Sequence, residues 1–377
     1  MNFEIENLPL YWRFGKNLKK IQGIPELYKF NFNFDKKLGL IIGNKDPEFK
    51  KILNKIYKQN ANIGYMIDGH NLALSYGEEF FRYLLKVSGK NFKKKLFLDF
   101  GCGGCITLLK LKNLGAKTLG VDPSPIALKY SKKYNIDLIN SYLNKNNSNI
   151  NADIIFSMDV MEHVLNPVEI LEQKALALKE NGRIIINVPN CEYSIKQGDI
   201  SMAIHQHVNM FDRHSLQRTI EMSGLEVERL DFSKFGSSIY CVAKKRKFKK
   251  RIKLEVNKKL YDNFFYKIPL RVKNFRDKIF PVLDKKTGFF IFQRSLPYLS
   301  SCNYGFNFQL YDNNILWHNK YLDGLKSKVL NQYDCARTPP NNLVVISDSF
   351  SKVIKSFFRK KVKSLNVITE KEIFKNE

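Results

Sequence analysis

The chain has 377 residues, 44% of them apolar, so it can form two or three domains with a sizeable core, and global disorder is excluded. Its 63 lysines and arginines against 36 aspartates and glutamates give a net charge of +27. A protein this basic often binds nucleic acid or an anionic membrane. Residues 1–243 carry 33 basic and 25 acidic residues, a net +8, whereas residues 244–377 carry 30 and 11, a net +19. The excess charge therefore belongs mainly to the C-terminal third.

Six scattered cysteines do not form the pattern of a disulfide framework. The first residues contain acids, Glu4 and Glu6, where a signal peptide needs positive charge. No stretch approaches the roughly 18 apolar residues of a membrane span. We expect a cytoplasmic protein.

Residues 1–77 are aromatic and irregular, with one helical pattern at 47–57, and a second helical pattern covers 78–88. From residue 96 onward, strands and helices alternate. Strands are predicted at 96–100, 117–122, 136–140, 153–157, 183–189, 225–232 and 238–245, and helices at 106–114, 125–135, 168–182 and 216–224. This order predicts an α/β fold with a doubly wound, Rossmann-like parallel sheet, in which the last two strands are antiparallel.

Residues 244–260 form the densest positive run, interleaved with Phe248, Ile252 and Leu254, and open a helix-compatible stretch to about residue 286. Beyond it, strands at 288–293, 308–314, 343–349 and 364–369 and a helix at 351–361 predict a second small α/β unit. We therefore expect four segments: an N-terminal region 1–77, a cofactor domain 78–243, a basic helical linker 244–286 and a C-terminal domain 287–377.

A glycine-rich turn directly follows the strand at 96–100 and opens a helix, with the sequence Gly101-Cys102-Gly103-Gly104-Cys105. Glycines there allow close approach of a ligand to the backbone, and the helix start offers free N–H groups. The next strand ends at Asp122, 21 residues after Gly101, where a carboxylate can reach the hydroxyls of a ribose. A dinucleotide fingerprint needs Gly or Ala at the position of Ile106, which disfavours NAD. With no second Cys or His pair nearby, Cys102 and Cys105 are not expected to bind metal.

This pattern resembles the first motif of the class I S-adenosylmethionine-dependent methyltransferases, Leu-Asp-x-Gly-Cys-Gly-x-Gly, with Cys105 in place of the third glycine. The resemblance implies that S-adenosylmethionine is the cofactor, that Asp99 and the Gly101–Gly103 backbone face its methionine part, and that Asp122 holds its ribose. The full set of expected cofactor contacts is Asp99, Gly101, Cys102, Gly103, Asp122, Pro123, Ser157 and Met158.

Two further segments carry acids and histidines. On a helix, Asp159, Glu162 and His163 would share one face at the carboxyl edge of the sheet, where open α/β sheets bind ligands. After the next strand come Asn190 and the loop His205-Gln206-His207. Two histidines separated by one residue point to opposite sides of an extended segment, so one of them is expected to face the pocket.

Residues 80–243 resemble the sugar methyltransferase branch of this family, and residues 38–57 resemble the end of its N-terminal zinc-binding module. No cysteine precedes Cys102, so no zinc is expected. The family loop Tyr-His-Glu-His corresponds here to Ile204-His205-Gln206-His207, which implies His207 as general base. His163 and His205 are further catalytic candidates, and Glu162 and Asn190 are candidate substrate contacts. The predicted reaction is O- or C-methylation of a nucleotide-activated or surface-glycan sugar.

One alternative comes from metal-assisted relatives that methylate quinols or RNA ends and carry Glu-x-x-Glu-His plus a distant histidine around Mg²⁺. Asp159, Glu162, His163 and His207 could supply that set, but we favour a site without metal. A second alternative is a non-catalytic scaffold with eroded motifs.

The C-terminal part resembles the small Rossmann-like domain attached to sugar methyltransferases, and a capping role over the cleft is expected. The basic run suits an anionic membrane or a glycan-lipid better than nucleic acid, because no nucleic-acid recognition fold accompanies it. The oligomeric state is left open.

Overall fold

The computed structural model describes residues 2–374 except 11–12, 18, 60–70, 90, 145–147, 235–236, 247–254 and 348–349. Phe248, Ile252 and Leu254 of the basic run therefore lie outside the described residues. The chain divides into two compact units. Unit 1 comprises Met1–Phe34, Tyr193–His205 and Lys258–Glu377, and unit 2 comprises Asp35–Glu192 and Gln206–Asn257. The four consecutive segments expected from the sequence differ from this division, because the chain passes repeatedly between the units.

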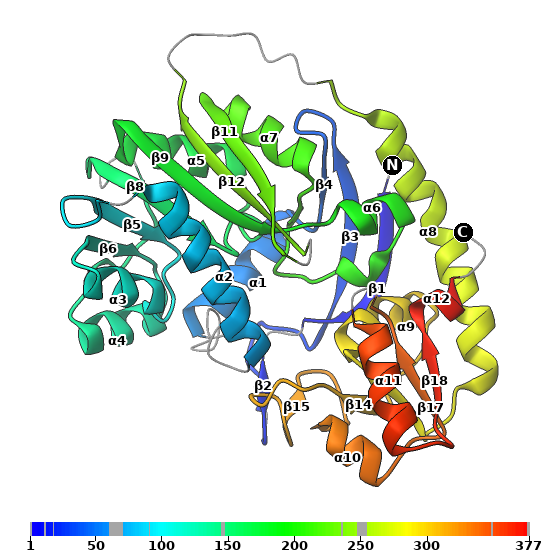
Figure 1. Ribbon diagram of the computed structural model, residues 1–377. Coiled ribbons are helices and arrows are strands. Elements are labelled where there is room, and N and C mark those ends of the chain that lie inside the picture. Colours follow the sequence, from blue (N-terminus) through cyan, green and yellow to red (C-terminus); the bar gives the residue numbers. More distant parts are fainter. Residues whose placement is uncertain are drawn as a thin grey trace. The chain divides into compact units, whose positions relative to one another are not determined.

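Unit 2 contains a seven-stranded sheet with the order β11-β12-β9-β8-β5-β6-β7 (Figure 1). The strands are β5 (Leu96–Phe100), β6 (Lys117–Val121), β7 (Asp137–Ile139), β8 (Ala152–Met158), β9 (Leu178–Pro189), β11 (Leu225–Phe232) and β12 (Ser238–Lys245). β5 to β9 are parallel, and β12 is antiparallel to both β9 and β11. This confirms the predicted Rossmann-like sheet and its antiparallel last pair.

Successive residues of each central strand point to opposite faces of the sheet, and both faces are covered by helices. Phe97 packs with α2 (Asn71–Ser88), α3 (Ile106–Asn113) and α4 (Pro125–Tyr134), whereas Leu98 packs with α5 (Pro167–Ala177) and α7 (Arg213–Met222). Unit 2 also contains α1 (Pro47–Gln59) and the antiparallel pair β4 (Leu40–Ile42) and β10 (Asn209–Met210). The predicted helix at 168–182 ends earlier, because Leu178 is extended and begins β9 directly.

Unit 1 contains a five-stranded parallel sheet with the order β16-β14-β13-β17-β18. Its strands are β13 (Thr287–Phe290), β14 (Gln309–Tyr311), β16 (Val329–Leu330), β17 (Asn342–Val345) and β18 (Asn366–Thr369). Two antiparallel pairs accompany it, β1 (Asn2–Pro9) with β3 (Leu27–Asp35) and β2 (Phe14–Gly15) with β15 (Tyr321–Leu322). The predicted strand at 288–293 stops at Phe290, because Ile291 adopts a left-handed conformation with φ 52°.

The helices of unit 1 are α6 (Glu192–Gln197), α8 (Lys258–Ile279), α9 (Leu296–Ser301), α10 (Gln332–Arg337), α11 (Ser351–Lys361) and α12 (Glu370–Ile373). Among the described residues, no helix is long and apolar enough to cross a bilayer.

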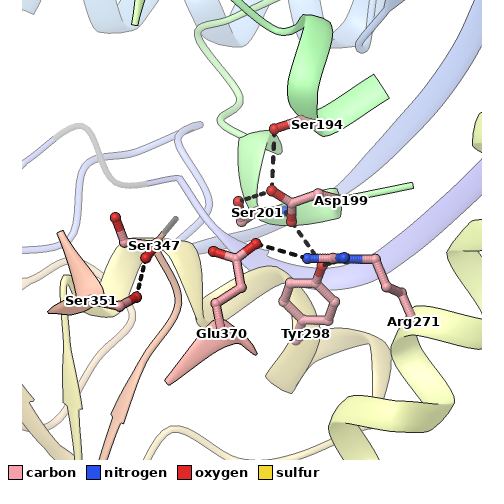
Figure 2. Close-up of polar contacts among 8 residues, drawn as sticks. All are labelled: Ser194, Asp199, Ser201, Arg271, Tyr298, Ser347, Ser351 and Glu370. Carbon is pink, nitrogen blue, oxygen red and sulfur yellow. Dashed lines mark hydrogen bonds and ion pairs between the residues drawn. The ribbon is translucent and has the colours of Figure 1, made fainter. Parts of the chain in front are cut away.

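A buried polar network in unit 1 joins four segments that are distant in sequence (Figure 2). The Arg271 guanidinium of α8 pairs with the Glu370 carboxylate at 3.0 Å and donates to the Tyr298 hydroxyl at 3.0 Å. Tyr298 in turn donates to Asp199 at 2.7 Å. Arg271 therefore fixes the rotation of α8 about its own axis.

Candidate active site at the carboxyl edge of the unit 2 sheet

The glycine turn after β5 has the backbone that its sequence requires. Gly101 and Gly103 have φ angles of 83° and 45°, a region that residues with a Cβ rarely adopt. A Cβ on Gly101 would lie 2.6 Å from Cγ2 of Val160, so the position is closed to larger residues. Cys105, where the family motif has glycine, is also left-handed with φ 59°.

Asp122 at the end of β6 is directed at this turn. Its carboxylate accepts from the backbone N–H of Gly103 at 2.9 Å and from that of Ser124 at 2.7 Å. The structure thus brings together the acid and the glycine turn that the sequence paired. Pro123 connects Asp122 to Ser124, the N-cap of α4.

A buried lysine that sequence reasoning missed lies beside Asp99. Lys174 of α5 is fully buried, and its ammonium donates to the Ser157 hydroxyl at 2.8 Å and lies 4.5 Å from the centre of the Phe100 ring. Burial lowers the pKa of Lys174 to about 7, against the opposing effect of Asp99 and Glu162. Burial likewise raises the pKa of Asp99 well above its usual range. The expected cofactor contact Ser157 therefore uses its hydroxyl to hold Lys174, whereas Met158 ends β8 beside it.

The segment after β8 is a turn, so the predicted helical face of Asp159, Glu162 and His163 does not form. Asp159 is left-handed with φ 52°, and the backbone N–H of His163 donates to the carbonyl of Val160 at 3.0 Å. Asp159 faces another partner, since its carboxylate accepts from the Tyr76 hydroxyl at 2.8 Å.

The segment that carries His207 supports this turn. The backbone N–H groups of Val208 and Asn209 donate to the Glu162 carbonyl at 2.8 and 3.0 Å. The Asn209 side chain donates to the carbonyls of Met161 and Val164 at 2.9 and 2.7 Å. Through these bonds the two predicted site segments are held together, although they lie more than 40 residues apart in sequence.

Glu162, His163 and His207 form a cluster in which one potential ligand atom from each residue lies within 4.8 Å of the others. The Glu162 side chain is 2% exposed, and neither carboxylate oxygen has a hydrogen-bond partner among the described residues. His163 Nε2 lies 3.8 Å from Glu162 Oε1, and the two imidazole rings meet edge to face at 4.8 Å.

The electrostatics of the cluster keep its histidines neutral. Burial lowers the pKa of His163 to about 4, and burial together with His163 lowers the pKa of His207 to about 3. Burial and Asp159 raise the pKa of Glu162 well above its usual range. A neutral imidazole with so low a pKa is a weak proton acceptor at neutral pH but keeps a free lone pair.

The cluster fits a divalent cation. A buried carboxylate needs hydrogen bonds or an opposite charge, and the two Glu162 oxygens have no hydrogen-bond partner among the described residues. A bound cation would supply the opposite charge. Nδ1 of His163 lies 2.9 Å from the Gln206 carbonyl, so it carries the proton and leaves the Nε2 lone pair free.

His205 and Asn190, two other predicted site residues, are outside this cluster. The His205 ring is buried in unit 1, where Nε2 lies 3.2 and 3.3 Å from the carbonyls of Tyr28 and Lys29. This geometry favours a packing role for His205 in unit 1, and its catalytic role stays a prediction. Asn190 caps the following turn by accepting from the Glu192 N–H at 3.1 Å.

Comparisons with known proteins agree with this fold. Residues 71–230 match the family model described as a methyltransferase domain. This stretch, with its glycine turn and Asp122, is a class I S-adenosylmethionine-dependent methyltransferase domain.

Similar proteins include two enzymes named ubiquinone biosynthesis O-methyltransferase. The mitochondrial one of Schizosaccharomyces pombe is 28% identical over 123 residues, which are 30% of this chain and 45% of that protein. The one of Hydrogenovibrio crunogenus is 24% identical over 162 residues, which are 40% of this chain and 64% of that protein. The chain thus spans about half the length of these relatives.

Among solved structures, magnesium protoporphyrin IX methyltransferase of Synechocystis with bound SAH is 14% identical with a TM-score of 0.42, over 52% of this chain and all of that one. A methyltransferase of Clostridium acetobutylicum is 13% identical with a TM-score of 0.37, over 45% of this chain and 91% of that one.

Proposed function

We propose that this protein transfers a methyl group from S-adenosylmethionine to a hydroxyl oxygen of a small quinol-type acceptor, with a divalent cation held by Glu162, His163 and His207. The observation that carries the proposal is the Glu162 carboxylate, buried beside two neutral histidines with neither oxygen partnered among the described residues. The names of the relatives support an O-methyl acceptor of quinol type, and they give no support to the sugar acceptor expected from the sequence.

The chain's own residues would divide the work as follows. The Gly101–Gly103 backbone and Asp122 would bind the cofactor, with Asp99 facing its methionine part. Asn209 and the Gln206 carbonyl orient the cluster by fixing the Glu162 turn and the His163 ring. A bound cation would lower the pKa of a coordinated hydroxyl and so make it a better nucleophile.

The low pKa of His207 favours a ligand role over the general-base role expected from the sequence. A base is most effective when its pKa lies near the working pH, and that of His207 lies well below it. In the proposed reaction the acceptor O–H bond and the sulfonium–methyl bond break, a C–O bond forms, and the proton leaves to solvent.

The test combines cofactor binding, cation binding and turnover. Calorimetry with S-adenosylmethionine comes first, because absence of binding contradicts every enzymatic function and supports the scaffold alternative. Mn²⁺ titration of the wild type, Glu162→Gln and His207→Ala follows, with Glu172→Gln, at an exposed position of α5 outside the cluster, as the control. We expect the two cluster variants to lose about tenfold or more in Mn²⁺ affinity and the control to keep it.

Turnover is then measured with labelled S-adenosylmethionine against catechols, demethylated quinols, nucleotide-sugars and RNA, with EDTA and with Mg²⁺ restored. Activity on a quinol or catechol that EDTA abolishes and Mg²⁺ restores supports the proposal. Cation-independent methylation of a nucleotide-sugar would instead support the sugar methyltransferase function.

A further inference from the structure

Helix α8 of unit 1 has two dissimilar faces. Tyr261, Phe264, Ile268 and Phe275 are buried at spacings of three, four and seven residues, which place them on one face. Arg271 belongs to the same face and is fixed by Glu370 and Tyr298 (Figure 2). Packing and hydrogen bonds therefore both fix which face of α8 points inward. They also fix which residues lie on the opposite, outward face.

The outward face carries large apolar side chains that the described residues leave exposed. Tyr266 and Leu270 lie one helical turn apart and are 78% and 44% exposed. Phe280, directly after the helix and ten residues beyond Leu270, is 55% exposed. Single exposed apolar residues are normal on a protein surface, but here three follow one another along α8 and the short helix Phe280–Val282 that continues it.

Basic side chains flank these three residues. Leaving out the buried Arg271, residues 258–286 carry eight lysines and arginines against three aspartates. Asp262 is paired with Lys258, and Asp277 is paired with Lys273 and Arg276. The remaining acid, Asp284, accepts hydrogen bonds from Asn341 and Thr287. The outward face thus combines apolar side chains with a net positive charge.

We propose that the outward face of α8 and the adjoining Phe280 form a docking surface for an anionic phospholipid bilayer. Tyr266, Leu270 and Phe280 enter the boundary between headgroups and acyl chains, a region that aromatic side chains favour. The lysines extend their aliphatic stems along the same boundary and place their charges among the lipid phosphates. A bilayer suits this face better than nucleic acid, because a phosphate backbone alone offers nothing apolar to cover these three side chains.

The inference does not depend on the proposed acceptor, and its test uses no enzymatic readout. The full chain is incubated with vesicles of equal parts phosphatidylcholine and phosphatidylglycerol, with vesicles of phosphatidylcholine alone as the reference, and the bound fraction is measured by sedimentation. We expect binding to the anionic vesicles only, weakening as salt is raised.

Matched variants separate the roles of apolar contact and charge. Tyr266→Ser with Leu270→Ser is expected to lower the partition coefficient at least tenfold, whereas Ile315→Ser, at a 61% exposed apolar position elsewhere in unit 1, leaves it unchanged. Lys259→Ser with Lys273→Ser is expected to lower it by about fivefold per charge removed. Lys50→Ser with Lys51→Ser, on α1 of unit 2, removes the same charge and should have little effect.

A direct probe of insertion uses Tyr266→Trp, whose fluorescence should shift to the blue with anionic vesicles, against Ile315→Trp as the unshifted control. Absence of vesicle binding, equal effects of the α8 and α1 charge variants, or an unshifted emission from the Tyr266→Trp variant would each overturn the proposal. So would a chain that self-associates through this face, detected as an oligomer that dissociates in the Tyr266→Ser, Leu270→Ser variant.

Discussion

Nδ1 of His163 lies 2.9 Å from the backbone carbonyl oxygen of Gln206, and this bond determines which ring nitrogen of His163 is protonated. With the proton on Nδ1, the Nε2 lone pair faces Glu162 Oε1 at 3.8 Å. Two acceptor atoms at this separation gain nothing from each other without a proton or a cation between them. The first prediction follows from this arrangement.

We expect the Glu162→Gln variant to be more stable than the wild type without divalent cation and less stable than the wild type with it. In EDTA the variant should be more stable than the wild type at pH 7, because a carboxyl group whose pKa is raised on folding lowers the free energy of unfolding above its unfolded pKa. Mn²⁺ at a hundredfold excess over its dissociation constant should add about 2.7 kcal/mol to the wild type alone. Urea unfolding in the two buffers measures both effects, and equal stabilisation of the two proteins by Mn²⁺ would contradict the cluster as its site.

Gly101→Ala should destabilise unit 2 and weaken S-adenosylmethionine binding. The left-handed backbone costs an alanine about 1 kcal/mol or more, and its Cβ would approach Val160 to 2.6 Å. The double variant with Val160→Ala should recover part of the lost stability, because it removes the clash with Val160. It should not recover all of it, because the backbone strain at residue 101 remains. Gly305→Ala is the control, because a Cβ there meets nothing within 4 Å. Unfolding midpoints and calorimetry measure the two effects, and a Gly101→Ala variant that behaves like Gly305→Ala would contradict the prediction.

Arg271→Ala should cost about 3–5 kcal/mol of unfolding free energy, because it leaves the buried Glu370 carboxylate without its partner. Lys273→Ala, two residues along the same helix, removes an exposed pair with Asp277 and should cost less than about 1 kcal/mol. Denaturant titration compares the two variants. Similar losses would show that burial of the Arg271 pair does not govern its contribution.

His205 should make unfolding sensitive to acid. Burial lowers its pKa in the folded protein to about 4, below its unfolded value of 6.5, so the unfolded chain binds the proton more readily. The free energy of unfolding is therefore unaffected by His205 above pH 6.5 and decreases as the pH falls towards 4. At pH 5 the decrease due to His205 is about 2 kcal/mol. His205→Gln keeps a donor for the Tyr28 and Lys29 carbonyls and should reduce the difference in stability between pH 7 and pH 5 by that amount. The same substitution at the exposed His214 serves as control, and equal changes in the two variants would count against His205 as the source.

Much of unit 2 could be predicted from the sequence because its strands and turns are encoded by short, local sequence patterns. The buried strands are short apolar runs bounded by turns, and the glycine turn and Asp122 occupy fixed positions at strand ends. The spacing of Asp159, Glu162 and His163 would place them on one face of a helix, but the segment is a turn. Hydrogen bonds from the Val208 and Asn209 backbone and from the Asn209 side chain stabilise that turn. Those partners are distant in sequence, so no local pattern reports them.

Two other features of the site were hidden from the sequence for the same reason. Lys174 lies in a helical pattern where a lysine normally faces water, and only the packed structure turns it towards Ser157 and Phe100. His205 and His207 are only two residues apart, yet the His205 ring contacts carbonyls of unit 1 whereas His207 belongs to the cluster of unit 2. A lysine among apolar positions of a helix was the one signal that could have indicated Lys174.

The passage of Tyr193–His205 into unit 1 has a consequence for how this protein can be divided. The stretch 71–230 is continuous in the gene, but thirteen of its residues, including the buried Asp199, complete the fold of the other unit. A chain cut to that stretch would carry a segment whose charges and apolar side chains have lost their partners. The stretch that matches the methyltransferase family model thus does not coincide with a compact unit of the fold, so functional studies call for the full chain.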